Sequence, residues 1–433
     1  MTTNLGALLG IDLPLIQAPM AGVQGSALAL AVSNAGALGS LPAAMLTPQV
    51  LRAELQTLRS GTQRPFNVNF FCHTPPVPDV TREAAWRVAL APFYAEAGLD
   101  ITAVPAGAGR VPFTAEAADL LEAFRPAVVS FHFGLPAPAL VQRVKAWGAR
   151  VLSSATTVEE ALWLEAHGAD AIIAQGLEAG GHRGMFLTDD LTTQMGTLAL
   201  LPQILRAVNV PVIAAGGITD AAGVAAAMAL GAAGVQVGTA YLLCTEATTS
   251  PIHRVALQSD AARHTALTNV FTGRPARGIV NRVMRELGVL CETAPAFPLA
   301  TAAMAPLRAW GEQQGMGDFS PLWSGQNASG CRPVDAAAVT RSLAQVFGRR
   351  RGRGAPPGRV VGLPHGQGKN DLRLQRLRRH QPQMARQVPG LRCLEHADRV
   401  RGRAGSLHPQ QPLCLAGQDC GSGHPGRDRG QRF

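Results

Sequence analysis

The densest group of residues that could do chemistry lies at positions 175–184, which read QGLEAGGHRG. Glycines in this segment would let the backbone approach a flat ligand closely. His182 stands among them, and a histidine side chain titrates near neutral pH, so it could accept or donate a proton. Gln175 ends an apolar run, where a buried amide needs a hydrogen-bonding partner. The segment is therefore predicted to bind a ligand and to carry a catalytic histidine.

Two further loops contain residue types suited to a phosphate group. Gly216 and Gly217 end one apolar run and stand just before Asp220, which is a favourable residue for beginning a helix. Gly238 and Thr239 stand at the corresponding place in the next run. Glycine N–H groups and a helix N-terminus bind phosphate well. A tight turn alone would also explain Gly216 and Gly217, but the second loop favours a phosphate site.

Other apolar runs also carry polar or small residues that could line a pocket. Met20 and Ala21 follow the first run, and Asn69 lies near the end of the third. His132 lies in the fourth run. A core histidine with satisfied ring nitrogens explains His132 as well as a pocket residue does.

Eight short apolar runs alternate with longer segments of helical period, which is the pattern of parallel strands joined by helices. An open doubly wound sheet is less favoured than a closed (β/α)8 barrel, because no GxGxxG follows the first run. In such a barrel the active site lies at the carboxyl ends of the strands, where all the candidate residues above fall. The predicted strands are residues 13–20, 37–41, 66–71, 128–134, 150–155, 171–176, 211–217 and 235–243.

The chain is predicted to have three parts. Residues 1–244 form the barrel, and residues 245–345 form a smaller, mainly helical domain or lid over its mouth. Residues 346–433 form a tail rich in Arg, Gly and Pro. From Phe347 on there are 18 Lys and Arg against 5 Asp and Glu, which leaves 21 and 24 in the rest of the chain. The tail is predicted to be disordered, with an RNA-binding Arg/Gly segment as the alternative.

Composition excludes several classes of function for the part of the chain before the tail. Its nearly balanced charge offers no reason to expect nucleic acid. We find no apolar stretch of 18 residues and no signal-peptide pattern, so we expect a cytoplasmic protein without a membrane span. The seven cysteines form no CxxC pair, and their number is odd. We therefore expect neither a disulfide framework nor a metal site.

Several segments together resemble the nitronate monooxygenase family, formerly called 2-nitropropane dioxygenases. They are LIQAPMAG at 15–22, SFHFGLP at 130–136, QGLEAGGHRG at 175–184, the glycine-rich run at 213–239 and WSGQN at 323–327. The resemblance extends over about residues 5–345. It implies FMN as cofactor, O2 as oxidant, and a nitronate or nitroalkane as substrate, with a carbonyl compound and nitrite as products. A monomer or a homodimer is expected.

The resemblance also assigns roles to individual residues. His182 would be the catalytic base or polarising group beside the nitronate. His132 and Phe297 would belong to the substrate pocket, and Phe297 stands where a tyrosine is expected, which places the substrate preference in question. The residues implied to bind FMN are Met20, Ala21, Asn69, Gln175, Gly180, Gly216, Gly217, Gln236, Val237, Gly238 and Thr239.

Other functions fit parts of the same pattern. An FMN-dependent enoyl-acyl-carrier-protein reductase would share the barrel and the Gly-Gly-His loop, and an NAD(P)H:quinone reductase is a third possibility. Both would consume NAD(P)H. A barrel that binds a flavin or a phosphate without catalysis is an alternative from a different class.

Overall fold

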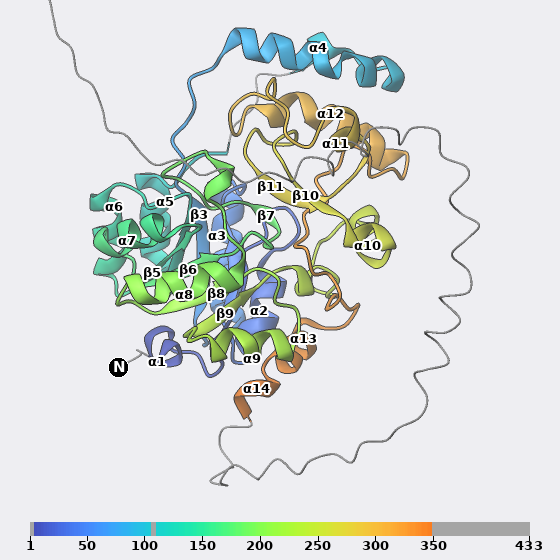
Figure 1. The fold of residues 1–433 in the computed structure, drawn as a ribbon. Coiled ribbons are helices and arrows are strands. Elements are labelled where there is room, and N and C mark those ends of the chain that lie inside the picture. Colours follow the sequence, from blue (N-terminus) through green and yellow to red (C-terminus); the bar gives the residue numbers. More distant parts are fainter. Residues whose placement is uncertain (1–3, 105–109, 349–433) are drawn as a thin grey trace, which may run out of the picture. The chain divides into compact units, whose positions relative to one another are not determined.

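The computed structural model describes residues 4–104 and 110–348 (Figure 1). Strands and helices alternate through the first part of the chain. The strands are β1 (Leu15–Gln17), β2 (Gly39–Pro42), β3 (Phe66–Phe71), β4 (Val128–His132), β5 (Arg150–Ala155), β6 (Ala171–Gln175), β7 (Gly181–His182), β8 (Val212–Ala215), β9 (Gly234–Val237), β10 (Thr265–Thr268) and β11 (Ala276–Ile279). The helices are α1 (Leu5–Leu9), α2 (Ser26–Asn34), α3 (Pro48–Gly61), α4 (Val80–Ala97), α5 (Ala115–Phe124), α6 (Pro138–Ala146), α7 (Val158–Ala166), α8 (Thr197–Ala207), α9 (Ala221–Ala229), α10 (Pro251–Gln258), α11 (Arg282–Glu286), α12 (Ala300–Gln313), α13 (Ala336–Leu343) and α14 (Gln345–Gly348).

Eight parallel strands form a closed barrel, which confirms the predicted fold class. Their hydrogen-bonded order is β1-β9-β8-β6-β5-β4-β3-β2. The sheet closes where β1 meets the residue before β2, because Ile16 bridges Leu38 in parallel register. The amide of Gln17 donates to Leu38 O at 2.9 Å, and the amide of Leu38 donates to Leu15 O at 2.9 Å. Each of the eight predicted strands overlaps one strand of this barrel.

Local capping explains where two helices beside the site begin. The Asp220 side chain accepts a hydrogen bond from the amide of Gly223 at 2.8 Å and so begins α9. Thr157 begins α7 by accepting from the amide of Glu160 at 3.2 Å. Such caps satisfy amides that have no partner within the helix. Asp220 is the starting residue that the sequence predicts for α9.

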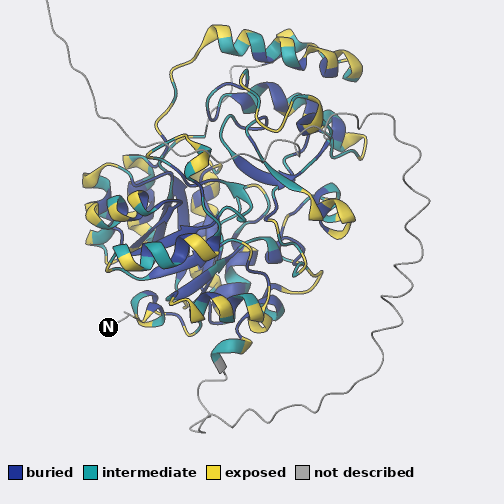
Figure 2. Cartoon of the chain, in the orientation of Figure 1, coloured by how far each residue is buried: buried dark blue, intermediate teal, exposed yellow. Residues whose placement is uncertain are grey.

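Alternation along the strands separates two apolar cores. One lies between the strands and the surrounding helices and includes Leu15 and Val235. The other includes Ile16 and Ile213 and is packed against Leu5 and Leu9 of α1. The strands are buried, whereas the helices expose their outer faces (Figure 2). Because neighbouring side chains of a strand point to opposite faces, one strand contributes to both cores. Helix α1 packs at one end of the barrel, so the opposite end holds the site.

The chain after the barrel contains two strands that the predicted, mainly helical domain did not include. Strands β10 and β11 pair in antiparallel register, and β11 also pairs with β7 of the barrel loop. The short runs TALT and ARGI contain few large apolar residues, so periodicity alone gives little signal for them. This small sheet joins residues 265–279 to the loop that carries His182.

None of the described helices is long and apolar enough to cross a lipid bilayer. The predicted basic tail, from residue 349 on, lies outside the described residues.

Candidate active site

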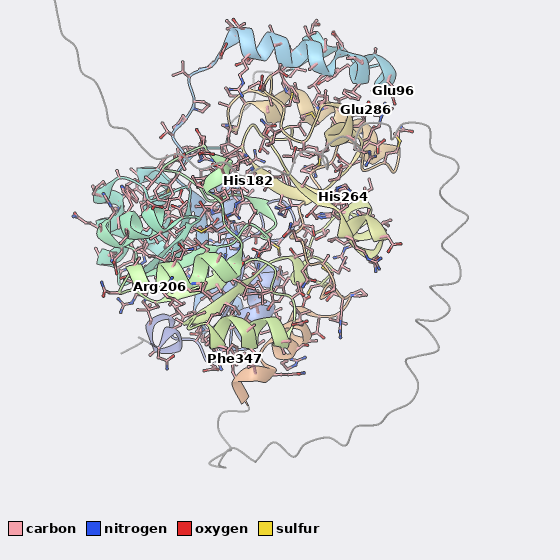
Figure 3. All side chains as sticks on the ribbon, viewed as in Figure 1. Glu96, His182, Arg206, His264, Glu286 and Phe347 are labelled. Carbon is pink, nitrogen blue, oxygen red and sulfur yellow. The ribbon has the colours of Figure 1, made fainter. Side chains whose placement is uncertain are left out.

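A cavity opens at the carboxyl ends of the barrel strands, with an empty volume of about 1360 Å³ including its open mouth. Its walls come from the ends of β3, β4, β5, β6, β8 and β9 and from the loops that follow them. Figure 3 places His182 at this end of the barrel, opposite α1. The structure thus brings together loops that are far apart in the sequence, as the fold requires of a barrel enzyme.

All but one of the residues predicted to bind the cofactor line this cavity, as do His182 and His132. Val237 is the exception, because it is buried in the core between strands and helices. Gln236 and Gly238, its neighbours, line the cavity. Because adjacent residues of a strand face opposite sides, any cofactor contact by Val237 would come from its backbone, and its cofactor-binding role stays a prediction. Phe297 also lies outside the cavity wall, packed beside the His182 ring with 5.3 Å between centroids.

One side of the cavity is built from the two predicted phosphate loops. Gly216 and Gly217 have backbone φ values of 118° and 72°, which residues other than glycine rarely adopt. A Cβ added at Gly238 would lie 3.3 Å from Ala18 Cβ. The Thr219 hydroxyl oxygen and Gln236 Oε1 are buried and have no hydrogen-bond partner among the described residues. Both residues line the cavity, so both offer unused polar atoms to a bound ligand.

Residues 323–327, the WSGQN segment, pack directly on these loops. The amide of Gly325 donates to Thr239 Oγ1 at 3.0 Å, and the amide of Gln326 donates to Glu178 O at 3.0 Å. Asn327 Nδ2 donates to Gly217 O at 3.2 Å. The chain that follows the barrel therefore contributes one wall of the site. Its action as a lid stays a prediction.

The His182 ring lies on the cavity wall in a positively charged, largely aromatic setting. Its Nε2 is 2.9 Å from Thr272 Oγ1. Burial is the main reason that the pKa of His182 lies well below its ordinary value. Nearby basic groups lower this pKa further; they are Arg110, His132, Arg274 and His73. At neutral pH the ring is therefore uncharged, which leaves one of its nitrogens able to accept a proton.

Two side chains hold the backbone of His182 in place. Gln175 Nε2 donates to His182 O at 3.0 Å, and Gln175 Oε1 accepts from the amide of Gly184 at 2.7 Å. His132 Nε2 lies 3.2 Å from the same carbonyl, while its Nδ1 lies 3.1 Å from Ser154 Oγ. A carbonyl only accepts, so His132 must donate through Nε2 and accept at Nδ1. The sequence predicts a hydrogen-bonding partner for the Gln175 side-chain amide, and these partners are backbone groups of the protein itself.

Burial lowers the pKa of His132 to about 4, so this ring is neutral at pH 7. It lines the cavity, is half-buried and has both ring nitrogens hydrogen-bonded, so both interpretations of His132 describe part of its environment. With both ring nitrogens engaged, it holds the His182 loop.

Sequence reasoning missed several residues of this site. Arg110 and Trp323 line the cavity, and the Trp323 ring lies 5.6 Å from that of His182. Thr272 contacts His182 from the turn between β10 and β11. Arg183 is buried beneath the loop. Only Arg183 and Trp323 belong to segments that the sequence had singled out; nothing in the pattern around Arg110 or Thr272 pointed to the site.

Replacing Gly180 with alanine is expected to weaken ligand binding by separating the WSGQN segment from the barrel loop. The new Cβ would lie 2.5 Å from the amide nitrogen of Gly325 and 2.6 Å from Ser324 C, so the backbone must move. Such overpacking costs about 1–3 kcal/mol. Bound ligand retained after gel filtration and the melting temperature should both fall in Gly180→Ala. In the control Gly223→Ala the nearest atoms are 3.5 Å away, and neither quantity should fall.

The fold and the site define this protein as a (β/α)8-barrel enzyme with a neutral histidine beside glycine loops suited to an anionic ligand. The nitronate monooxygenase family model matches residues 2–345. A nitronate monooxygenase of Pseudomonas aeruginosa is 43% identical over 350 residues, covering 80% of this chain and 99% of that protein. One of Paraburkholderia phytofirmans is 43% identical, covering 78% of this chain and 92% of that protein.

The solved structures include a similar protein, nitroalkane oxidase from Streptomyces ansochromogenes, with a TM-score of 0.73 and 38% identity. The match covers 81% of this chain and 99% of that one. The chain therefore belongs to the nitronate monooxygenase family and is an oxidoreductase. These findings confirm the predicted family and enzyme class.

Proposed function

We propose that this protein binds FMN and uses O2 to oxidise alkyl nitronates to carbonyl compounds and nitrite. The observation that carries the proposal is the neutral His182 ring on the wall of a cavity whose other side is a glycine-lined, polar cradle. Family membership at 43% identity supports nitronate oxidation as the reaction class. The related nitroalkane oxidase supports a neutral nitroalkane as a second substrate.

The residues present fit FMN. Gly216 and Gly217 adopt backbone conformations that leave room for a phosphate, with the unpartnered Thr219 hydroxyl beside them. The unpartnered Gln236 Oε1 would accept a hydrogen bond from the flavin ring, and Asn69 and Met20 would contact it from the other strands. When bound, FMN supplies the electron-transfer chemistry between substrate and oxygen.

The protein's own residues then attract and orient the substrate. The guanidinium of Arg110 on the cavity wall favours an anion, which suits a nitronate. The rings of Trp323 and His182 border the same space. For a neutral nitroalkane, His182 accepts the proton from the carbon beside the nitro group, and the electron pair left behind makes the nitronate.

Oxygen uptake tests this proposal. FMN-reconstituted protein is mixed with propionate 3-nitronate without NAD(P)H, and nitrite is measured in parallel. Superoxide dismutase and a protein-free sample control for uncatalysed oxidation. Oxygen uptake with nitrite release supports the proposal. No uptake, combined with NADH oxidation under nitrogen in the presence of an enoyl thioester or a quinone, would overturn it in favour of a reductase.

A further inference from the structure

The His182 ring is linked through one hydroxyl group to a backbone carbonyl. Thr272 Oγ1 lies 2.9 Å from His182 Nε2 and 3.4 Å from Arg274 O. Thr272 is buried, so solvent does not compete for its hydroxyl group. No described residue forms a hydrogen bond with Nδ1, the other ring nitrogen, and His182 lines the cavity. Nδ1 is therefore the nitrogen available to a substrate.

We propose that Thr272 is a positioning residue that keeps the proton of the neutral His182 ring on Nε2, so that the lone pair of Nδ1 faces the cavity as the base for neutral nitroalkanes. This inference rests on the proposed function and extends it to Thr272, which is 90 residues from His182 in the sequence. It assigns a function to the small sheet that joins the β10–β11 turn to the barrel loop.

Hydrogen-bond counting favours this proton position. A hydroxyl group has one proton to donate and lone pairs to accept with, whereas the Arg274 carbonyl can only accept. If Thr272 donates to Arg274 O, it must accept from the Nε2–H of His182, and both contacts are hydrogen bonds. If Thr272 donates to Nε2 instead, the contact with Arg274 O is lost. The distance of 3.4 Å between Thr272 Oγ1 and Arg274 O is long for a hydrogen bond. Any stabilisation from this contact nevertheless favours the arrangement in which Nε2 of His182 carries the proton.

The fold holds both partners of this link rigidly. Strand β7 pairs with β11, with His182 opposite Ala276, and the amide of Arg183 donates to Pro275 O at 2.9 Å. Gln175 and His132 fix the His182 carbonyl from the barrel side. The ring therefore meets the Thr272 hydroxyl without needing a mobile segment to order, which is what a positioned base requires.

The setting of the ring is consistent with a neutral base. The rings of Phe71, Phe133 and Phe297 stand edge-on to it, with 5.3–6.1 Å between ring centroids. The charged or titratable groups that influence it are Arg110 before α5, His132 from β4, Arg274 from the turn before β11, and His73 after β3. All four disfavour a second proton on the ring. The proton-transfer step is balanced: the carbon-bound proton moves to Nδ1, its electron pair remains on the nitronate, and His182 becomes an imidazolium.

The position of the proton can be measured without turnover. FMN-loaded protein is labelled with ¹⁵N-histidine, and the His182 signals are identified by their loss in His182→Gln. Two-bond ¹H–¹⁵N spectra distinguish the two neutral tautomers. The Nε2–H pattern is expected for the natural protein. An Nδ1–H pattern would overturn the proposal without the need for any Thr272 variant.

Two Thr272 variants test its consequence for catalysis. Thr272→Val keeps the shape and removes the hydroxyl, whereas Thr272→Ser keeps the hydroxyl. Turnover of neutral nitroethane is expected to fall at least tenfold relative to turnover of ethylnitronate in Thr272→Val, and the Nε2–H pattern should weaken. Thr272→Ser should restore both. Equal losses with the two substrates, or no rescue by serine, would mean that Thr272 is only structural.

These outcomes are separable from failure of the proposed function. If the natural protein does not oxidise ethylnitronate with oxygen uptake, the proposed function fails and the tautomer measurement still tests the hydrogen-bonded link. If the natural protein is active and the substrate ratio is unchanged in Thr272→Val, only the assignment of Thr272 fails. Should Thr272→Val not fold, Thr272→Ala provides the same loss of the hydroxyl with less steric demand.

Discussion

His182→Asn is expected to lose about 100- to 10,000-fold in kcat/KM for neutral nitroethane, the range over which a positioned general base contributes. The loss for ethylnitronate should be smaller, about tenfold, because that substrate has already given up its proton. The reason lies in the site: the His182 ring lines the cavity, is neutral at neutral pH, and has one nitrogen that forms no hydrogen bond with any described residue. Parallel assays of nitrite release with the two substrates measure the difference.

The pH dependence of nitroethane turnover tests whether His182 acts as a base. A base works in its unprotonated form, and burial together with the adjacent cations holds the pKa of His182 well below its ordinary value. Activity with nitroethane should therefore persist as the pH falls through 6.5 and decline only at lower pH. His264→Asn, which replaces an exposed histidine (Figure 3), serves as the control and should leave both activities unchanged. Equal losses with both substrates in His182→Asn would assign His182 to substrate binding instead of proton transfer.

Arg183→Met is expected to lower the free energy of unfolding by about 2–4 kcal/mol and to lower turnover about 100-fold. The guanidinium of Arg183 is completely buried and donates to Gly176 O at 2.6 Å, Gln175 O at 2.7 Å and Gln194 Oε1 at 3.0 Å. Methionine fills similar space but leaves these oxygens without their donor, and each buried unpaired acceptor costs about 1–3 kcal/mol. The removed desolvation cost of the charge offsets part of that loss.

The functional effect follows from the position of these oxygens. One belongs to Gln175, the last residue of β6, and another to Gly176, where the loop carrying His182 begins, so their displacement moves the ring relative to the cavity. A shift of about 1 Å can cost 100-fold in rate. Urea unfolding and nitrite assays measure the two effects. Arg206→Met removes an exposed arginine of α8 (Figure 3) and should change neither. An Arg183→Met protein with normal stability and turnover would contradict this account.

Much of the barrel could be predicted from the sequence because its signals are local. Parallel strands that are buried on both faces are continuously apolar over four to six residues, as in VVSFH and AIIAQ. The start of a helix can be predicted from a single capping residue, as Asp220 shows for α9. Since every strand of a (β/α)8 barrel ends at the same rim, identifying the runs was sufficient to bring residues 20, 69, 182, 216 and 238 to one cavity.

The same local signals could not show which side chains contact His182. Thr272 reaches its ring from 90 residues away, through a pairing of β7 with β11 that involves a strand of two residues. Strands this short have no readable periodicity. Arg110 and Phe297 reach the ring or its cavity from segments with no recognisable pattern of their own. A run of consecutive residues also conceals the alternation of faces until strand boundaries are known, so the sequence did not show that the Val237 side chain lies in the core.

The sequence by itself determined the barrel, the glycine loops and the identity of the central histidine, since each depends on residue type and on spacing along one segment. The tertiary structure determined the protonation state of that histidine and the direction of its hydrogen bonds. Burial, the positive charge of Arg110 and Arg274, and the Thr272 hydroxyl converge on one ring from separate parts of the chain. A pKa and a tautomer are properties of this converged environment, so no single stretch of residues contains them.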